Sequence, residues 1–332
     1  MRYALLFVLC SCGGSDKPAE EPHTVASATA SSTATEPPPP ASSPDTQRGI
    51  SALQANDLAT AKSAFEAAIA ANARDADAHH YLAVTLEKSN DKTGAEREYK
   101  AALAIKPDLA EAAANLGAIY VEAQRWDDAI TLLKPEAQKR NDSAPVQFNL
   151  GLALAGKGDQ QGAARAFDTA VRITPNDAML LYTYGHTLAG WNQNDAAVAK
   201  LKAARDAAGA QSELLGSIGH DLLLLRAVPD CIATFDKAIA AKDNAQFRTD
   251  RALCRLANKD DPGATADLEA AVQADGKYAL AHFWLGTRRM NARRWADAAK
   301  ELDAYLKLDP NGPHAKSARE ALAVAKNGGK KR

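Results

Sequence analysis

The chain has 332 residues, of which 46% are hydrophobic, and its 40 basic and 41 acidic residues give a formal net charge of −1. This balance lacks the positive field on which non-specific nucleic-acid binding depends, so nucleic acid is not an expected partner. Aromatic residues make up only 6% and much of the apolar share is alanine, which favours closely packed helices over a sheet sandwich.

The N-terminus carries a short segment typical of export. Arg2 precedes an apolar run over residues 3–9, which is too short to span a bilayer. The following Leu9-Cys10-Ser11-Cys12 resembles the bacterial lipoprotein signal, in which the cysteine is lipidated and becomes the mature N-terminus. The resemblance implies a signal peptide over residues 1–11 and a lipid on Cys12. The alternatives are a signal peptide without lipidation, or a start codon placed elsewhere.

Residues 12–46 are predicted to form a disordered tether behind this cysteine. The segment is rich in Pro, Ser, Thr and Ala, and Val25 is its only large aliphatic residue, so it cannot bury enough surface to offset chain entropy. Gly13, rather than an aspartate, follows the cysteine. By the same resemblance this implies the outer membrane rather than the inner one, with the rest of the chain facing the periplasm.

From about residue 42 the sequence repeats itself every 34 residues. Two repeats carry small and large apolar residues at the same seven positions: Leu82, Ala83, Leu86, Ala95, Tyr99, Ala102 and Pro107 in one, and Leu150, Gly151, Leu154, Ala163, Phe167, Ala170 and Pro175 in the other. Small residues at positions 8, 20 and 27 let helices approach closely, and the large residues at positions 11 and 24 fill the gaps between them.

The pattern resembles the tetratricopeptide repeat, which implies an all-α, right-handed superhelical solenoid of helix-turn-helix units over residues 47–326. Eight repeats fit, at 42–75, 76–109, 110–143, 144–177, 178–211, 212–244, 245–278 and 279–312. A capping helix is expected over 313–326, with its inner face formed by Ala315, Ala318, Leu322 and Ala325, before a basic tail at 327–332.

Two repeats depart from the pattern. Pro135 falls inside the second helix of repeat three and predicts an interruption or kink there. Repeat seven places Arg251 and Arg255 where apolar residues are expected, and the repeat before it is one residue short. The frame over residues 245–278 could therefore be shifted by one residue.

Catalytic and metal-binding motifs are not found in the sequence. Gly156-Lys157-Gly158 resembles a phosphate loop only superficially, because it lacks the terminal GK[ST] and follows a helix. Cysteine and histidine spacing does not match a zinc site. The sequence predicts a protein that is not an enzyme and has no metal, no cofactor and no small-molecule substrate.

Two further residue pairs leave alternatives open. His186 and His220 occupy position 9 of adjacent repeats, where they could form a metal or pH-sensitive contact, or serve as ordinary polar contacts. Cys231 and Cys254 lie on neighbouring helices. An oxidising periplasm would permit a disulfide, and the alternative is two independent buried residues.

The resemblance places partner contacts on positions 2, 5, 9 and 12 of each first helix, along a concave groove. In repeats four to six these are mainly apolar, aromatic and imidazole side chains: Phe148, Leu152, Met179, Tyr182, His186, His220 and Leu223. Such residues suit a polypeptide partner with buried anchors. Asn115 and Asn149 match single positions of the family's carboxylate clamp, but its cationic members are absent.

Arginines concentrate in repeats seven and eight. They could form a second surface for an acidic partner or anionic lipid, or a solvated face paired to nearby acids: Arg248, Arg288, Arg289, Arg293 and Arg294, with Arg251 and Arg255. The sequence thus predicts a membrane-anchored scaffold that binds a protein partner in assembly or secretion at the bacterial cell envelope. The alternatives are an accessory subunit of an enzyme complex, and a structural spacer between membrane and cell wall.

Overall fold

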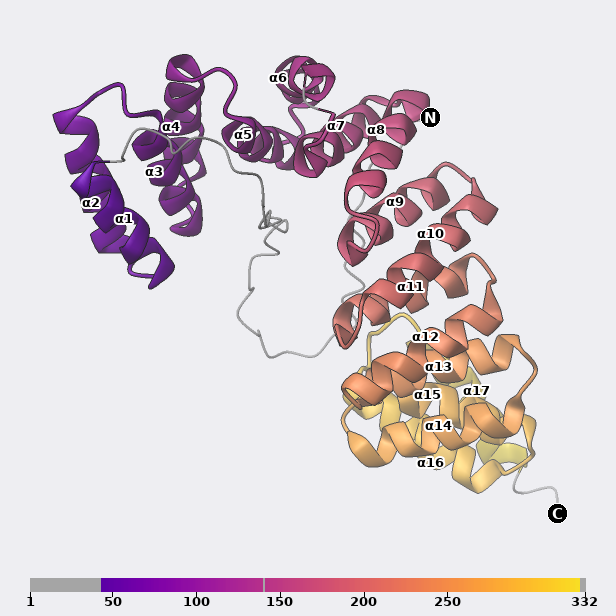
Figure 1. Cartoon of the computed structure of the whole chain (residues 1–332). Coiled ribbons are helices and arrows are strands. Elements are labelled where there is room, and N and C mark those ends of the chain that lie inside the picture. The colour runs from indigo at the N-terminus through magenta and orange to yellow at the C-terminus, as the bar shows by residue number, and fades with distance from the viewer. Residues whose placement is uncertain (1–42, 140, 329–332) are drawn as a thin grey trace. The chain divides into compact units, whose positions relative to one another are not determined.

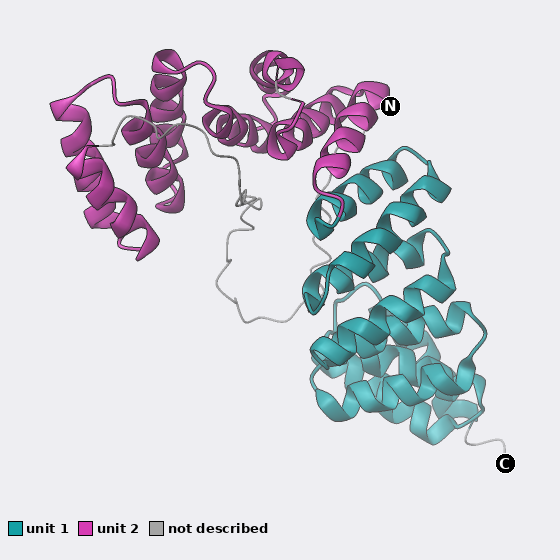
Figure 2. Ribbon diagram, viewed as in Figure 1, with its two compact units in different colours: residues 1–21, 176–332 teal, residues 22–175 magenta. Residues whose placement is uncertain are grey.

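The computed structural model describes residues 43–139 and 141–328. Within these residues every regular element is an α-helix, which confirms the predicted all-α repeat fold. The helices form two compact units that divide after Pro175 (Figures 1 and 2). The predicted signal peptide, Cys12 and all but the last residues of the tether lie outside the described residues.

The unit that ends at Pro175 contains four antiparallel helix pairs, each made of a first helix (A) and a second helix (B). The pairs are α1 (Pro44–Gln54) with α2 (Leu58–Ala71), α3 (Ala76–Lys88) with α4 (Lys92–Ile105), α5 (Ala110–Glu122) with α6 (Trp126–Lys139), and α7 (Ala144–Lys157) with α8 (Gln160–Ile173).

The unit from Asn176 onward contains four more pairs and a final helix. The pairs are α9 (Ala178–Gly190) with α10 (Asn194–Ala207), α11 (Ser212–Leu224) with α12 (Val228–Ala241), α13 (Ala245–Ala257) with α14 (Asp261–Ala274), and α15 (Ala279–Asn291) with α16 (Trp295–Leu308). The final helix, α17 (Ala315–Gly328), packs on α16 and buries the four residues predicted for its inner face, which confirms its orientation.

The turn between the A and B helices has the same design in every pair. One residue adopts a left-handed backbone with φ between 56° and 84°: Asn56, Asn90, Gln124, Gly158, Asn192, Arg226, Lys259 and Arg293. In four turns the next residue is an aspartate whose side chain accepts a hydrogen bond from a backbone N–H of the B helix: Asp57, Asp91, Asp159 and Asp260. Gly156-Lys157-Gly158 is thus an ordinary repeat turn.

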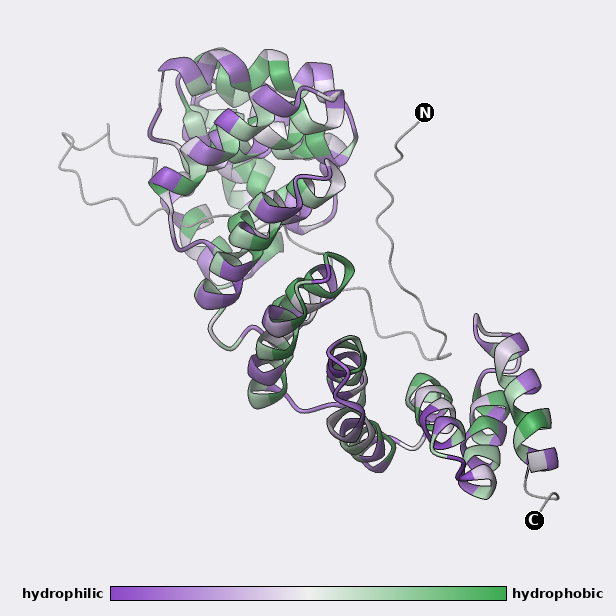
Figure 3. Cartoon of the chain, turned by 90° about the vertical axis from the view of Figure 1, so that its right-hand side faces the viewer, coloured by the Kyte–Doolittle hydropathy of each residue, from purple (hydrophilic) through white to green (hydrophobic). Residues whose placement is uncertain are grey.

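The core of each pair forms where a large B-helix side chain meets a small A-helix residue. Phe235 of α12 is fully buried, and a Cβ added to Gly219 of α11 would lie 2.7 Å from its ring. Glycine at this position therefore sets how closely the two helices approach. Hydrophobic residues recur along all the helices and hydrophilic residues separate them (Figure 3). Each helix can therefore bury one side and expose another.

The structure differs from the sequence expectations at three points. The helix α1 begins at Pro44, inside the end of the predicted tether, because Ser43 caps it by accepting a hydrogen bond from the backbone of Thr46. The helix α6 is not interrupted at Pro135, with Leu133 and Ala137 buried on either side of it, and a kink there stays a prediction. The helix α17 extends two residues into the predicted basic tail. In repeat seven the sequence left a shift of one residue open. The helix α13 begins at Ala245, which is the first residue of the predicted repeat.

Candidate binding face

The first predicted partner-binding residues lie on α7. Phe148 and Leu152 are half-buried on this helix, and the Phe148 ring centroid lies 5.9 Å from that of Phe167 on α8. Phe148 is thus braced by the B helix behind it while part of its ring remains open to solvent. Both residues belong to the unit that ends at Pro175.

The other five predicted residues lie on two adjacent A helices of the second unit. Met179, Tyr182 and His186 project from α9, and His220 and Leu223 from α11. Met179 is 43% exposed and His220 is exposed, whereas Tyr182 and Leu223 are half-buried. We call these five residues the α9–α11 face. The structure brings them together on neighbouring helices, and a single surface shared with Phe148 and Leu152 stays a prediction.

A hydrogen bond between His186 and Asp221 joins the two helices of this face. The Nδ1 atom of His186 lies 2.7 Å from Oδ2 of Asp221. The Asp221 side chain is only 9% exposed, whereas the imidazole is 59% exposed. The hydrogen bond to this carboxylate raises the pKa of His186 above its ordinary value, against the opposing effect of partial burial.

Tyr182 lies beside this pair, with its ring centroid 5.9 Å from that of His186. Burial, with the nearby Asp221 carboxylate, raises the pKa of Tyr182 to about 12, so the phenol stays protonated throughout the physiological range. The α9–α11 face therefore offers a neutral hydroxyl and an imidazole that gains charge readily.

Sequence reasoning missed Asp221. Asp221 directly follows His220, a predicted partner-binding residue of α11. Its side chain is buried by packing and does not point toward a partner. Residues about one repeat apart meet on neighbouring A helices. The spacing of 35 residues between His186 and Asp221 was therefore the signal that could have predicted their contact. Asp250 of α13 was also missed, and burial raises its pKa to about 7.

The two asparagines that match the family's clamp positions serve the packing instead. Asn149 is buried and its Nδ2 atom donates to the carbonyl oxygen of Ala114 at 2.9 Å, which connects α7 to α5. The amide of Asn115 donates to the hydroxyl of Tyr99, which itself donates to Glu87. These contacts engage the amide nitrogen of each asparagine within the repeat packing.

The predicted basic surface is largely paired to acids of its own unit. The ion pairs are Arg248 with Asp243, Arg288 with Asp261, Arg289 with Glu269 and Glu301, and Arg294 with Asp297. Arg293 is exposed in the turn that precedes α16. This pairing favours the alternative of a solvated face, and the role as a contact surface stays a prediction.

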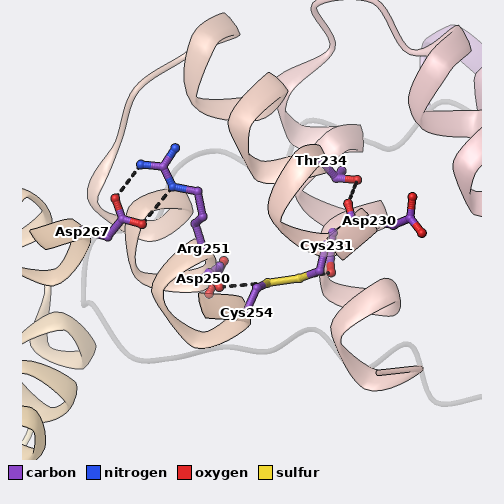
Figure 4. The surroundings of a disulfide bond; sticks show 8 residues. Asp230, Cys231, Thr234, Asp250, Arg251, Cys254 and Asp267 are labelled. Carbon is purple, nitrogen blue, oxygen red and sulfur yellow. Dashed lines mark hydrogen bonds and ion pairs between the residues drawn. A yellow bond between two sulfur atoms is a disulfide. The ribbon is translucent and has the colours of Figure 1, made fainter. Parts of the chain in front are cut away.

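Cys231 of α12 and Cys254 of α13 form a disulfide between consecutive repeats, with Cα atoms 6.1 Å apart (Figure 4). Both residues are fully buried. The carbonyl oxygens of Gly219 and Asp250 each lie 3.3 Å from one of the sulfurs. Of the two alternatives that the sequence left open, the structure has the disulfide.

The described part of the chain shows neither a metal cluster nor a membrane-spanning helix. Its His, Cys, Asp and Glu side chains do not gather in groups of three or more that could hold a metal ion. None of its helices combines the length and apolar character that crossing a bilayer requires.

Comparison with known proteins identifies the repeat. Residues 46–110 and 114–178 match the family model described as tetratricopeptide repeat. Protein FlbA of Caulobacter vibrioides is 25% identical over 201 residues, which cover 50% of this chain and 34% of FlbA. The chain thus spans about a third of that relative's length.

Two solved structures match longer stretches of the chain. Yeast Tom70 has a TM-score of 0.46 at 16% identity, and the match covers 86% of this chain and 63% of Tom70. Pseudomonas aeruginosa PilF has a TM-score of 0.45 at 16% identity, and the match covers 63% of this chain and 96% of PilF.

Proposed function

Because this chain carries tetratricopeptide repeats, we propose that it is a membrane-anchored, non-catalytic scaffold that binds a partner polypeptide through the outward side chains of its A helices. The α9–α11 face is the observation that carries this proposal. It leaves Met179 exposed and Tyr182 and Leu223 only half-buried. Aromatic and large apolar side chains of this kind supply most of the affinity at protein interfaces.

The proposed site of action is the bacterial cell envelope, where the chain would serve assembly or secretion. It would face the periplasm, and the proposal favours the outer membrane over the inner one. The lipoprotein-like sequence around Cys12 supports the anchor. The disulfide between Cys231 and Cys254 supports an oxidising compartment, because disulfides persist there and are rare in a reducing cytosol. An accessory subunit of an enzyme complex and a spacer between membrane and cell wall remain the alternative functions.

Cross-linked pull-down from membranes tests the binding function. We expect Phe148→Ala combined with Tyr182→Ala to abolish capture of the principal partner, because truncating an aromatic anchor costs about 2 kcal/mol or more, roughly a thirtyfold loss of affinity. Lys100→Ala is the matched control, since its amine pairs with Glu96 on an exposed part of α4. Capture at wild-type strength by the double variant would place the contact elsewhere on the chain.

Metabolic acyl labelling tests the anchor separately. Labelled fatty acid should appear on the wild-type chain and be absent from Cys12→Ser, which should also leave the membrane fraction. Equal label on both chains, or a wild-type chain found only in the soluble fraction, contradicts lipidation at Cys12.

A further inference from the structure

The histidine of the α9–α11 face is held in a fixed position by a buried acid. Asp221 approaches from the next repeat and occupies Nδ1 of His186, and the carboxylate itself is almost fully covered. The imidazole remains more than half exposed, so its other nitrogen, Nε2, is available to a ligand. Fixing one ring nitrogen with a carboxylate orients the ring and reduces the rotamer freedom that binding would otherwise have to remove.

Few other titratable groups act on this imidazole. Asp221 is the charged group whose hydrogen bond and field raise the pKa of His186. Tyr182 on the same helix stays neutral, and His220 lies exposed at the same position one repeat later. On α10, behind α9, Lys200 lies over the ring of Tyr184. From α11, Glu213 is engaged by Lys242.

We propose that His186 recognises an acidic side chain of the bound polypeptide, an aspartate or glutamate next to an apolar residue that packs against Tyr182 and Leu223. The inference rests on the proposed function and specifies the chemistry of its partner. A protonated imidazole donates from Nε2 to the partner's carboxylate, and a charge-assisted hydrogen bond of this kind is stronger than a neutral one. Asp221 acts as a positioning residue, because it reaches the partner only through His186.

The direction of pH dependence follows from the same geometry. The pKa of His186 lies above the ordinary histidine value of about 6.5, so the imidazolium is present below that value and is lost as pH rises through the raised pKa. The preference for acidic partners should accordingly be stronger at pH 6 than at pH 9. The apolar contacts of Tyr182 and Leu223 do not titrate in this range, so they should persist at both pH values.

Selection from a phage-displayed library of random 12-residue peptides on the full chain tests the inference. Wild type should enrich peptides that combine acidic and apolar residues at pH 6 and show a weaker acidic preference at pH 9. His186→Lys keeps a positive charge at both pH values and should retain the preference at both. His186→Gln should enrich apolar peptides alone. A peptide selected by wild type at pH 6 should bind about tenfold more weakly to the Gln variant in fluorescence anisotropy.

The outcomes separate this inference from the proposed function. Equal acidic enrichment by wild type and His186→Gln would overturn the role of His186, and so would apolar enrichment alone by wild type at pH 6. In both cases a binding face for polypeptides would still stand if Tyr182→Ala reduces the selection. Failure of the wild-type chain to enrich any peptide would contradict the binding face itself. Cooperative thermal unfolding of the His186 variants, lowered only by the loss of the hydrogen bond to Asp221, would exclude misfolding as the cause.

Discussion

The carboxylate of Asp267 lies in the packed interior of repeat seven and accepts from two arginines. Its side chain is 4% exposed, and its Oδ2 atom lies 2.9 Å from Nε of Arg251 and 2.9 Å from Nη1 of Arg255. The arginines replace apolar residues of α13, and Asp267 supplies their countercharge from α14. The helix pair is thus held by a charged cluster at positions where repeat six has Ile218 and Leu222.

Removing this buried acid should destabilise the protein strongly. We expect Asp267→Ala to lower the free energy of unfolding by about 3 kcal/mol or more, because two largely buried guanidinium groups lose their buried countercharge and keep only the more exposed Asp236 and Asp260. Denaturant titration followed by far-UV circular dichroism measures the change. Glu66→Gln, which removes an exposed i,i+4 partner of Lys62, is the control and should cost less than about 1 kcal/mol. A similar loss in both variants would contradict a special role for the cluster.

A second buried group connects α15 to α16. Nδ1 of His282 lies 2.6 Å from Oε2 of Glu301, and its Nε2 lies 3.0 Å from the carbonyl oxygen of Gly276. Arg289 donates to the other oxygen of Glu301 at 2.6 Å. The hydrogen bond to Glu301 raises the pKa of His282, and the hydrogen bond from His282, with the charge of Arg289, lowers the pKa of Glu301.

This pair should make stability depend on pH in a defined window. The contribution of His282 is complete below its unfolded pKa of about 6.5 and is lost as pH rises through the raised folded value. The contribution of Glu301 is present above about 4.3 and is lost as pH falls through its lowered value. We therefore expect His282→Gln to lose more stability relative to wild type at pH 6 than at pH 8.5, as measured by denaturant midpoints.

Gln147 occupies the position in repeat four that His282 occupies in repeat eight, so glutamine fits there. Its Nε2 atom donates to the carbonyl oxygen of Ala137 at 3.0 Å. The substitution at His282 thus places a neutral amide at a position that accommodates glutamine and removes the titrating group. A difference between variant and wild type that stays constant from pH 6 to 8.5 would contradict the linkage.

At the scale of elements, the disulfide changes how α12 and α13 depend on each other. Elsewhere in this unit, consecutive repeats are joined by one backbone connection, by packing and by non-covalent contacts such as the hydrogen bond between His186 and Asp221. Between α12 and α13 the bond adds a covalent link across 23 residues of sequence. The two helices therefore cannot separate fully even when their packing is lost.

Reduction should remove this link. Closing a loop of this length stabilises by about 3 kcal/mol in the chain-entropy model, so Cys231→Ser combined with Cys254→Ser should lose an amount of that order. Wild type in dithiothreitol should lose a similar amount, and the double variant should not respond to the reductant. Unfolding followed with and without reductant measures this. Thiol alkylation that labels both residues in the unreduced, denatured wild type would show that the disulfide does not form.

At a larger scale, each repeat within a unit packs on its neighbours in sequence, and α17 covers the last pair of the second unit. Leu268 of α14 and Leu285 of α15 share one apolar cluster with Ala252. Removing α15, α16 and α17 would therefore uncover Leu268 while the helices before it keep their own packing.

Deletion of residues 279–332 should lower solubility and leave helical circular dichroism per residue similar to wild type. Static light scattering against concentration measures the first effect. Deletion of residues 329–332 alone is the control, and it should scatter as wild type does. Loss of helicity throughout the shortened chain would contradict stability that depends only on neighbouring repeats.

The repeat pattern predicted the helices well because its signals are local. Small residues such as Gly219 and large ones such as Phe235 fix a helix pair within one repeat, and the capping face of α17 follows from its own periodicity. The bond between His186 and Asp221 could not be predicted in the same way. It depends on the rotation of one A helix against the next, which no single repeat encodes.

The disulfide also limits how far the chain can be stretched. A polypeptide anchored at one end and bound to a partner at the other bears mechanical load, and its repeats lengthen as they unravel. Residues 231–254 are closed into a loop by the bond, so the 23-residue separation contributes only the span of the bridge. About 70 Å of extension is thereby withheld, at about 3.3 Å per residue. An oxidised chain under load would remain correspondingly shorter than a reduced one.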